Sequence, residues 1–207
     1  GDSEKVLVVN GTGAMYDYFG NSNGAAMAPW AAYANDIKTV VVGYGITATT
    51  KYLLGKERTS SESDKQVSYE NVKNVILGDT VKIIVGERLW SQDLTTMVKD
   101  ATTGKTNITR NDIKNLEVIN LSYSLETIPQ YFLGAPNKVR EIFVPKAAIN
   151  AKSGAFSQSS DVESLIFEDG FNGFDDNATN VDFFGGNSNA LKELIIPASV
   201  TNIPNGT

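Results

Sequence analysis

The sequence of 207 residues contains no cysteine and no histidine. These absences exclude thiolate or imidazole metal sites and nucleophilic catalysis by a Ser-His-Asp or Cys-His arrangement. Carboxylate, lysine, tyrosine or oxygen-ligated metal chemistry remains open. Cysteine-free chains occur in both exported and cytosolic proteins, so the lack of cysteine says little about location.

Positive charge is also scarce, because the net charge is −6 and the isoelectric point is near 4.7. Phosphate neutralisation needs clustered lysine and arginine, so nucleic-acid binding is not expected, nor is a polybasic membrane anchor. No apolar run approaches the roughly 20 residues of a transmembrane segment. The chain opens at Gly1 without a visible signal peptide, from which we expect a processed protein, its signal peptide already removed, or a trimmed chain.

What the sequence does contain is a repeat of five mostly apolar anchors at relative positions 0, 3, 5, 9 and 12. The six copies begin at Ile37, Val72, Leu116, Val139, Val162 and Leu191. The shortest spacing is 23 residues, and the longer spacings carry polar insertions around 55–69, 95–111 and 175–180, which we expect to be loops. A repeat of this length predicts a solenoid, which presents surface rather than enclosing a catalytic cavity.

Each copy predicts one coil. Positions 3 and 5 alternate as in a β-strand whose anchors point inward, and a large apolar residue after the last anchor would close the back on a short helix or turn. We expect a capping segment over 1–36, with Val6, Val8 and the turn at 11–15, followed by the solenoid over 37–207. The last copy has no visible cap, which indicates either truncation or stacking on another molecule.

The closest copies, LKELIIPASVTNI (191–203) and VREIFVPKAAINAKSGAF (139–156), resemble the BspA-type leucine-rich repeats of bacterial surface proteins. The N-terminal segment, with GTGAM at 11–15, resembles the first coil of that family. The resemblance implies a leucine-rich-repeat solenoid: short parallel strands in a curved ribbon, backed by short helices and turns, with about six coils and loop insertions. It further implies a secreted or surface-displayed adhesion protein of a host-associated or gut bacterium, without catalytic residues or cofactors.

The residue at relative position 4 of each copy should point outward from its strand. This column, here called the outer ladder, contains Val41, Ile76, Asn120, Phe143, Ile166 and Ile195. An exposed apolar column with polar neighbours is typical of a protein-binding patch, so we expect Phe143 and Ile166 to anchor a partner. The alternative is that β-branched residues here simply suit a strand and pair with their neighbours.

Other residues offer weaker candidates. An acidic stretch could hold calcium through oxygen ligands, but its spacing does not match an EF-hand loop, and a solvated loop explains it better; its residues are Glu168, Asp169, Asp175, Asp176 and Asn177. Aromatic residues could stack on sugars or serve as cap packing; these are Tyr16, Tyr18, Trp30, Tyr44 and Trp90. A paired-carboxylate glycosidase would need a cleft that a solenoid does not obviously offer.

The sequence therefore favours a non-enzymatic protein-interaction or adhesion module at the cell surface or in the extracellular space. Its partner would be an unknown host or bacterial surface protein, with a glycan as the other option. A carbohydrate-binding module using the N-terminal aromatics and a structural stalk are the alternatives.

Overall fold

The computed structural model describes part of the chain. The described residues are 4–16, 28–50, 53–54, 69–85, 95–99, 106–110, 113–134, 136–172, 174, 182–184, 186 and 189–203. The insertion at 55–68 lies outside them, as do the acidic residues at 175–180.

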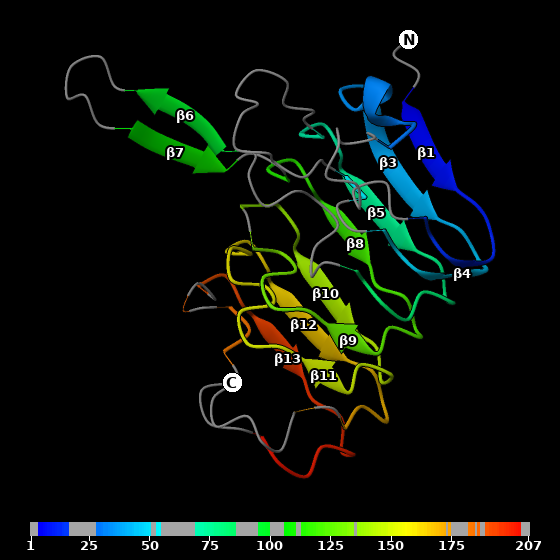
Figure 1. Ribbon diagram of the computed structural model, residues 1–207. Helices are drawn as coiled ribbons and strands as arrows, with labels where there is room; N and C mark the ends of the chain where they lie inside the picture. The colour runs from blue at the N-terminus through cyan, green and yellow to red at the C-terminus, as the bar shows by residue number, and fades with distance from the viewer. Residues whose placement is uncertain are drawn as a thin grey trace.

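Two parallel sheets follow one another along the molecule (Figure 1). The first contains four strands in the order β1 (Lys5–Val9), β3 (Ile37–Val42), β5 (Asn74–Leu77) and β8 (Val118–Asn120). The second contains β10 (Glu141–Val144), β12 (Ser164–Phe167) and β13 (Glu193–Ile195). Each coil contributes one strand, so the strands are stacked in chain order as the repeat predicts.

A second row of shorter pairings joins the coils after the main strands. It pairs β2 (Gly13–Ala14) with β4 (Ile46–Ala48), and β9 (Thr127–Ile128) with β11 (Asn150–Ala151). The short helices expected at the back are nearly absent from the described residues, where the one helix is the 3-10 turn η1 (Ala31–Tyr33). Turns and these short strands close the coils instead.

The insertion expected as a loop around 95–111 contains regular structure. β6 (Thr95–Lys99) and β7 (Thr106–Arg110) form an antiparallel hairpin that projects from the parallel sheets (Figure 1). The β-branched residues of these segments, among them Thr95, Val98 and Ile108, suit a strand, so here β-propensity outweighs the polar composition.

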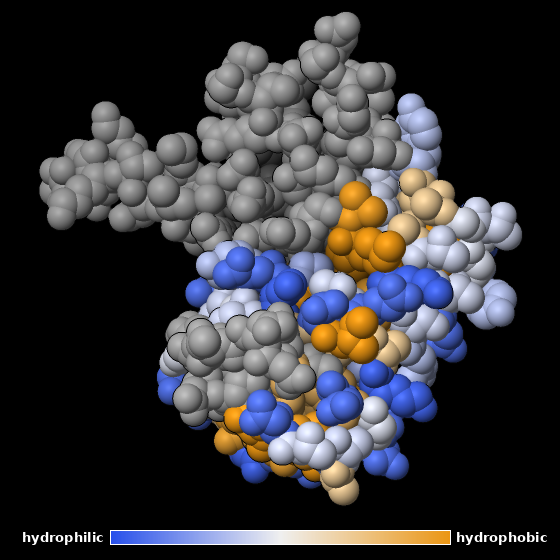
Figure 2. Space-filling model, turned by 60° about the horizontal axis from the view of Figure 1, so that its bottom comes forward, coloured by the Kyte–Doolittle hydropathy of each residue, from blue (hydrophilic) through white to orange (hydrophobic). Residues whose placement is uncertain are grey.

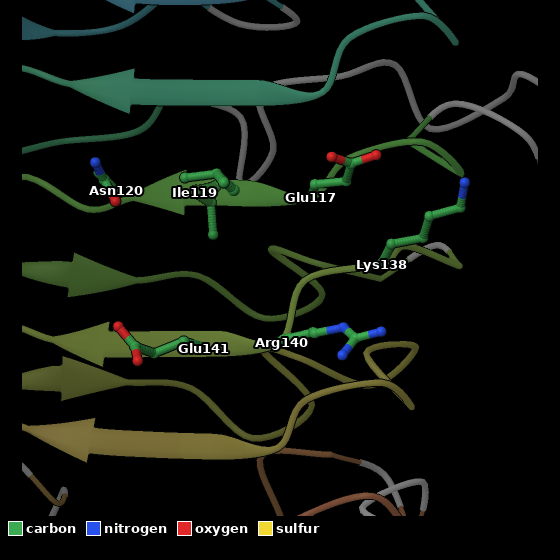
Figure 3. A pocket seen from close by; sticks show the side chains of 7 residues that line it. Glu117, Ile119, Asn120, Lys138, Arg140 and Glu141 are labelled. Carbon is green, nitrogen blue, oxygen red and sulfur yellow. The ribbon is translucent and has the colours of Figure 1, made fainter.

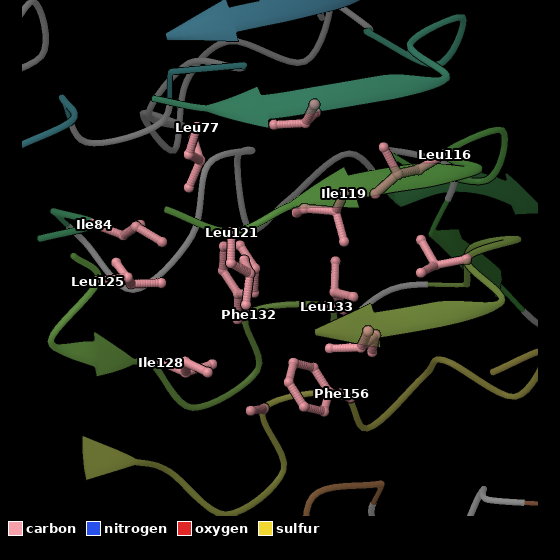
Figure 4. Packing of buried hydrophobic residues seen from close by; sticks show 14 of the residues in the cluster. Leu77, Ile84, Leu116, Ile119, Leu121, Leu125, Ile128, Phe132, Leu133 and Phe156 are labelled. Carbon is pink, nitrogen blue, oxygen red and sulfur yellow. The ribbon is translucent and has the colours of Figure 1, made fainter. Parts of the chain in front are cut away.

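The repeat anchors form one continuous core. Every anchor of the first five coils is buried, including Thr49 at 1 % exposure, and Figure 4 shows their side chains packed between neighbouring coils. The residues predicted to close the coils are buried too: Leu54, Leu133, Phe156, Phe183 and Phe184. Leu89, predicted for the same role, lies outside the described residues.

Asparagine side chains add polar links between coils that the apolar pattern does not reveal. Asn71 donates its side-chain amide to the carbonyl of Asn35 at 2.8 Å, and Asn115 donates to the carbonyl of Glu70 at 2.9 Å. The amide of buried Asn137 donates to the Ser159 hydroxyl at 3.0 Å. The first two bonds satisfy carbonyls at the coil starts, and the third satisfies a buried hydroxyl.

The N-terminal segment stacks as an additional coil. β1 pairs in parallel with β3, and β2 with β4, so the segment 4–16 repeats the strand–turn–strand path of the coil that follows. The approach is close: a Cβ on Gly45, whose φ is +99°, would lie 2.5 Å from the carbonyl oxygen of Gly11. Only glycine meets both the left-handed backbone and the available space.

The last coil differs from the others because nothing described packs beyond β13. Its anchors Leu194 and Ile203 are 49 % and 52 % exposed, whereas the matching anchors one coil earlier, Leu165 and Phe174, are buried. Figure 2, which brings the lower end of Figure 1 forward, shows separate apolar patches bordered by hydrophilic residues. The described part of the chain contains no helix long and apolar enough to cross a membrane.

Candidate protein-interaction face

The predicted outer ladder is a real column within each sheet. Cα pairing aligns Val41 with Ile76 and Ile76 with Asn120 in the first sheet. In the second sheet it aligns Phe143 with Ile166 and Ile166 with Ile195. The six residues therefore come from six successive coils and share the face opposite the core.

None of these side chains is fully buried. Asn120 and Ile195 are exposed, and the other four are half-buried by their neighbours along the column. Sequence reasoning missed a seventh member. Val8 pairs with Val41 and is 51 % exposed, so it extends the outer ladder to the first coil. Its signal in the sequence is the apolar alternation around Val8, but the same segment lacks the full anchor pattern and therefore resembles a cap.

Polar residues and ion pairs line one flank of the ladder. The carboxylate of Glu163 contacts Lys192 at 3.1 Å and Arg140 at 3.6 Å. The hydrogen bond and charge of Lys192, together with the charge of Arg140, lower the pKa of Glu163. Lys73 and Glu117 form a similar contact at 3.4 Å between adjacent coils. An apolar column beside such pairs has the layout of a binding patch with a polar rim.

The outer face is interrupted between β8 and β10. Among the described residues no strand pairing joins these neighbours, and for this reason the strands form two sheets rather than one. The coils stay attached on both sides of the interruption. Lys138 donates its main-chain N–H to Leu116 at 2.8 Å, and β9 pairs with β11. The result is an opening in the sheet face that does not separate the coils.

Two adjoining hollows lie at this opening, and together we call them the interstrand groove. One, of about 550 Å³, is lined by Glu117, Val118, Ile119, Asn120, Lys138, Arg140 and Glu141. The other, of about 400 Å³, is lined by Ile76, Leu77, Asp79, Ile119, Asn120, Leu121, Tyr123, Glu141 and Phe143. They share three residues, so they are the two ends of one groove. Figure 3 shows the first hollow, with Asn120 and Glu141, which also line the second hollow, on one side and Glu117, Lys138 and Arg140 on the other.

The weaker candidates are only partly described. Trp30 packs against the core and donates its indole N–H to the Leu53 carbonyl at 2.9 Å, which fits cap packing. Tyr16 and Tyr44 are 69 % and 81 % exposed, and Tyr18 and Trp90 lie outside the described residues.

The calcium candidate is likewise incomplete. Both carboxylate oxygens of Glu168 contact Lys146, one at its main-chain N–H at 2.9 Å and one at its ammonium at 3.2 Å. Asp175, Asp176 and Asn177 lie outside the described residues. Within the part of the chain that the structure describes, no three acidic residues gather in a metal-binding cluster.

Stacked coils with parallel strands and a continuous inner face of leucine, isoleucine, valine and phenylalanine define a leucine-rich-repeat solenoid. The model of the family described as BspA type leucine rich repeat region (6 copies) matches residues 65–182 and 109–207. The chain belongs to this family. Such repeats generally form non-enzymatic scaffolds for protein interaction.

The chain is also similar to a solved structure, that of a leucine-rich repeat protein from Eubacterium ventriosum ATCC 27560. The identity is 18 % and the TM-score is 0.47, over 95 % of this chain and 56 % of that one. The chain thus spans little more than half the length of that protein. No curated protein sequence matches it.

Proposed function

We propose that this chain is a non-enzymatic module of a surface-displayed or secreted protein and that it binds a protein partner through the outer ladder. The observation that carries the proposal is a pair of accessible apolar columns, one on each sheet. They consist of Val8, Val41 and Ile76, and of Phe143, Ile166 and Ile195. A strand face that needed only solubility would carry polar residues at these positions.

Phe143 and Ile166 are the expected anchors. They are paired neighbours on β10 and β12, and the ring of Phe143 contacts Tyr123 edge-on with centroids 5.8 Å apart. An aromatic and a branched aliphatic residue, held side by side on a rigid sheet, lose little conformational freedom when a partner covers them. Ion pairs such as Arg140 with Glu163 would remain at the rim.

The test is quantitative capture from a mixture of extracellular host proteins and bacterial surface proteins. The chain, its Phe143→Ser/Ile166→Ser double variant and a Tyr44→Ser variant are immobilised separately, and the captured proteins are compared by mass spectrometry. Tyr44 is the control because it is large, 81 % exposed and outside the ladder. We expect the double variant to lose a protein that the control keeps. Equal capture by all three would refute the proposal.

Self-association is checked separately, because two ladders could cover each other. Light scattering coupled to gel filtration, across a concentration series, should show a monomer. A dimer that the double variant abolishes would mean that the ladder binds a second copy and is not free for a foreign partner.

A further inference from the structure

The interstrand groove has a feature that the outer ladder alone does not explain, namely its uneven distribution of charge. The cations at the basic end already have partners: the Lys138 ammonium donates to the Asn115 amide oxygen at 3.1 Å, and Arg140 forms an ion pair with Glu163 at 3.6 Å. At the other end, Asp79 and Glu141 are exposed, and neither has an ion-pair or hydrogen-bond partner for its carboxylate among the described residues. The groove therefore carries uncompensated negative charge at one end only.

Main-chain groups add acceptors and donors to this groove. Between β10 and β12, Ser164 and Glu168 donate their N–H groups to the carbonyls of Arg140 and Val144. The equivalent positions one coil earlier are Glu141, whose N–H makes no such bond to the described residues of the coil before, and Pro145, whose nitrogen carries no hydrogen to donate. Carbonyls along the facing edge of β8 are thus left for another donor.

A proline at this position does not by itself prevent two strands from pairing. Pro197 occupies the position of Pro145 in the last coil, yet β13 still pairs with β12. The opening between β8 and β10 is therefore a separate feature of this pair of coils.

Aromatic side chains form the wall beside the two free carboxylates. Tyr123, which is 56 % exposed, and Phe143 line the same hollow as Asp79 and Glu141. Carboxylates that accept hydrogen bonds, next to an aromatic wall, suit a planar cation, because guanidinium pairs with carboxylates in a bidentate manner and stacks on rings. The lining of this hollow contains no basic residue that would repel it.

We propose that the acidic end of the interstrand groove binds an arginine side chain of the protein partner. Glu141 and Asp79 accept its N–H groups, the Asn120 amide oxygen is a third acceptor, and the Tyr123 ring lies beside its plane. This inference rests on the proposed function, since it names one contact that a partner on the outer ladder would make next to Phe143.

The test uses a defined probe, acetyl-Gly-Arg-Gly-amide, and its citrulline counterpart, which has nearly the same shape without the charge. Each is titrated into the isotopically labelled chain at fixed ionic strength, and amide signals are followed by NMR. We expect the arginine peptide to shift signals of Asn120, Glu141 and Phe143, and the citrulline peptide to leave them in place.

Two charge-neutralising variants locate the contact. Glu141→Gln should weaken binding of the arginine peptide about tenfold, the size expected when a charged hydrogen-bond acceptor is lost. Asp169→Asn, on the exposed turn after β12, removes the same charge outside the groove and should leave the affinity unchanged. Equal binding of the citrulline peptide, equal weakening by both variants, or no shift at all would each overturn the inference.

These outcomes separate the inference from the proposed function. If the arginine peptide fails to bind but Phe143→Ser/Ile166→Ser still loses a captured protein, the groove proposal is wrong and the outer ladder stands. If the peptide binds as expected while capture is unchanged, the pocket accepts guanidinium but the ladder is not the partner surface.

Discussion

From the stacking of the coils we expect leucine-to-alanine substitution to lower the unfolding free energy by very different amounts at two paired positions. Leu165 and Leu194 occupy the same repeat position and face each other across β12 and β13. Leu165 is 2 % exposed between two coils, whereas Leu194 is 49 % exposed with a coil on one side only. Replacing each with alanine compares a leucine inside the core with a leucine at the equivalent position of the uncovered last coil.

The magnitudes follow from burial. Leu165→Ala removes a buried side chain and leaves a cavity, which costs about 3 kcal/mol. Leu194→Ala gives up only half of the transfer free energy and leaves no cavity, so it should cost about 1 kcal/mol. For a chain of this size the melting temperature should fall by about 6–12 °C for Leu165→Ala and by about 2–4 °C for Leu194→Ala.

Urea unfolding followed by far-ultraviolet circular dichroism measures both losses in free energy, and thermal melts give the temperatures. The measurements are made at two protein concentrations, because association would stabilise the last coil by mass action. Equal destabilisation by the two substitutions would contradict the reasoning, since it would mean that Leu194 is as well covered in solution as Leu165.

The remaining predictions concern Tyr69, Asn137 and Gly78. The buried hydroxyl of Tyr69 has no hydrogen-bond partner within the described part of the chain, so Tyr69→Phe should keep or raise the unfolding free energy, by up to about 1 kcal/mol, and a clear loss would refute this. Burial also raises the pKa of Tyr69, so ionisation of this residue leaves the unfolding free energy unchanged below pH about 10 and lowers it as the pH rises further. The urea midpoint of the wild type should therefore drop more steeply above that pH than the midpoint of Tyr69→Phe. Asn137→Ala should cost about 2 kcal/mol in urea unfolding because it leaves the buried Ser159 hydroxyl unpaired, and a cost near zero would contradict that pairing. Gly78→Ala should cost about 1–3 kcal/mol, since its Cβ would lie 2.7 Å from the Val42 carbonyl oxygen, and an unchanged thermal melt would show that the approach is looser.

Much of the fold follows from local spacing. The anchors at positions 3 and 5 must share a face because strand side chains alternate. This alternation correctly predicts that Leu165 faces the core and that Ile166 faces outward. The outer ladder was predictable for the same reason. Val8 was missed because an additional coil without the full anchor pattern resembles a cap.

Features that depend on pairing between coils were not predictable. Asn120 and Glu141 look like ordinary outward residues, and nothing in their spacing indicates that the strands β8 and β10 do not pair. Whether two strands pair depends on the geometry of whole coils, which a period of apolar residues does not encode. The hairpin of β6 and β7 was missed because threonine-rich segments suit loops and strands alike.

The most direct test of the central claim replaces Phe143 with the photo-crosslinking residue p-benzoylphenylalanine and, in a second protein, replaces Tyr44 in the same way. Both are irradiated in the protein mixture from which a partner is captured, and crosslinked peptides are identified by mass spectrometry. The account predicts crosslinks to the partner from position 143 and none from position 44. Crosslinks of equal yield from both positions, or from position 44 alone, would show that the partner does not bind on the outer ladder.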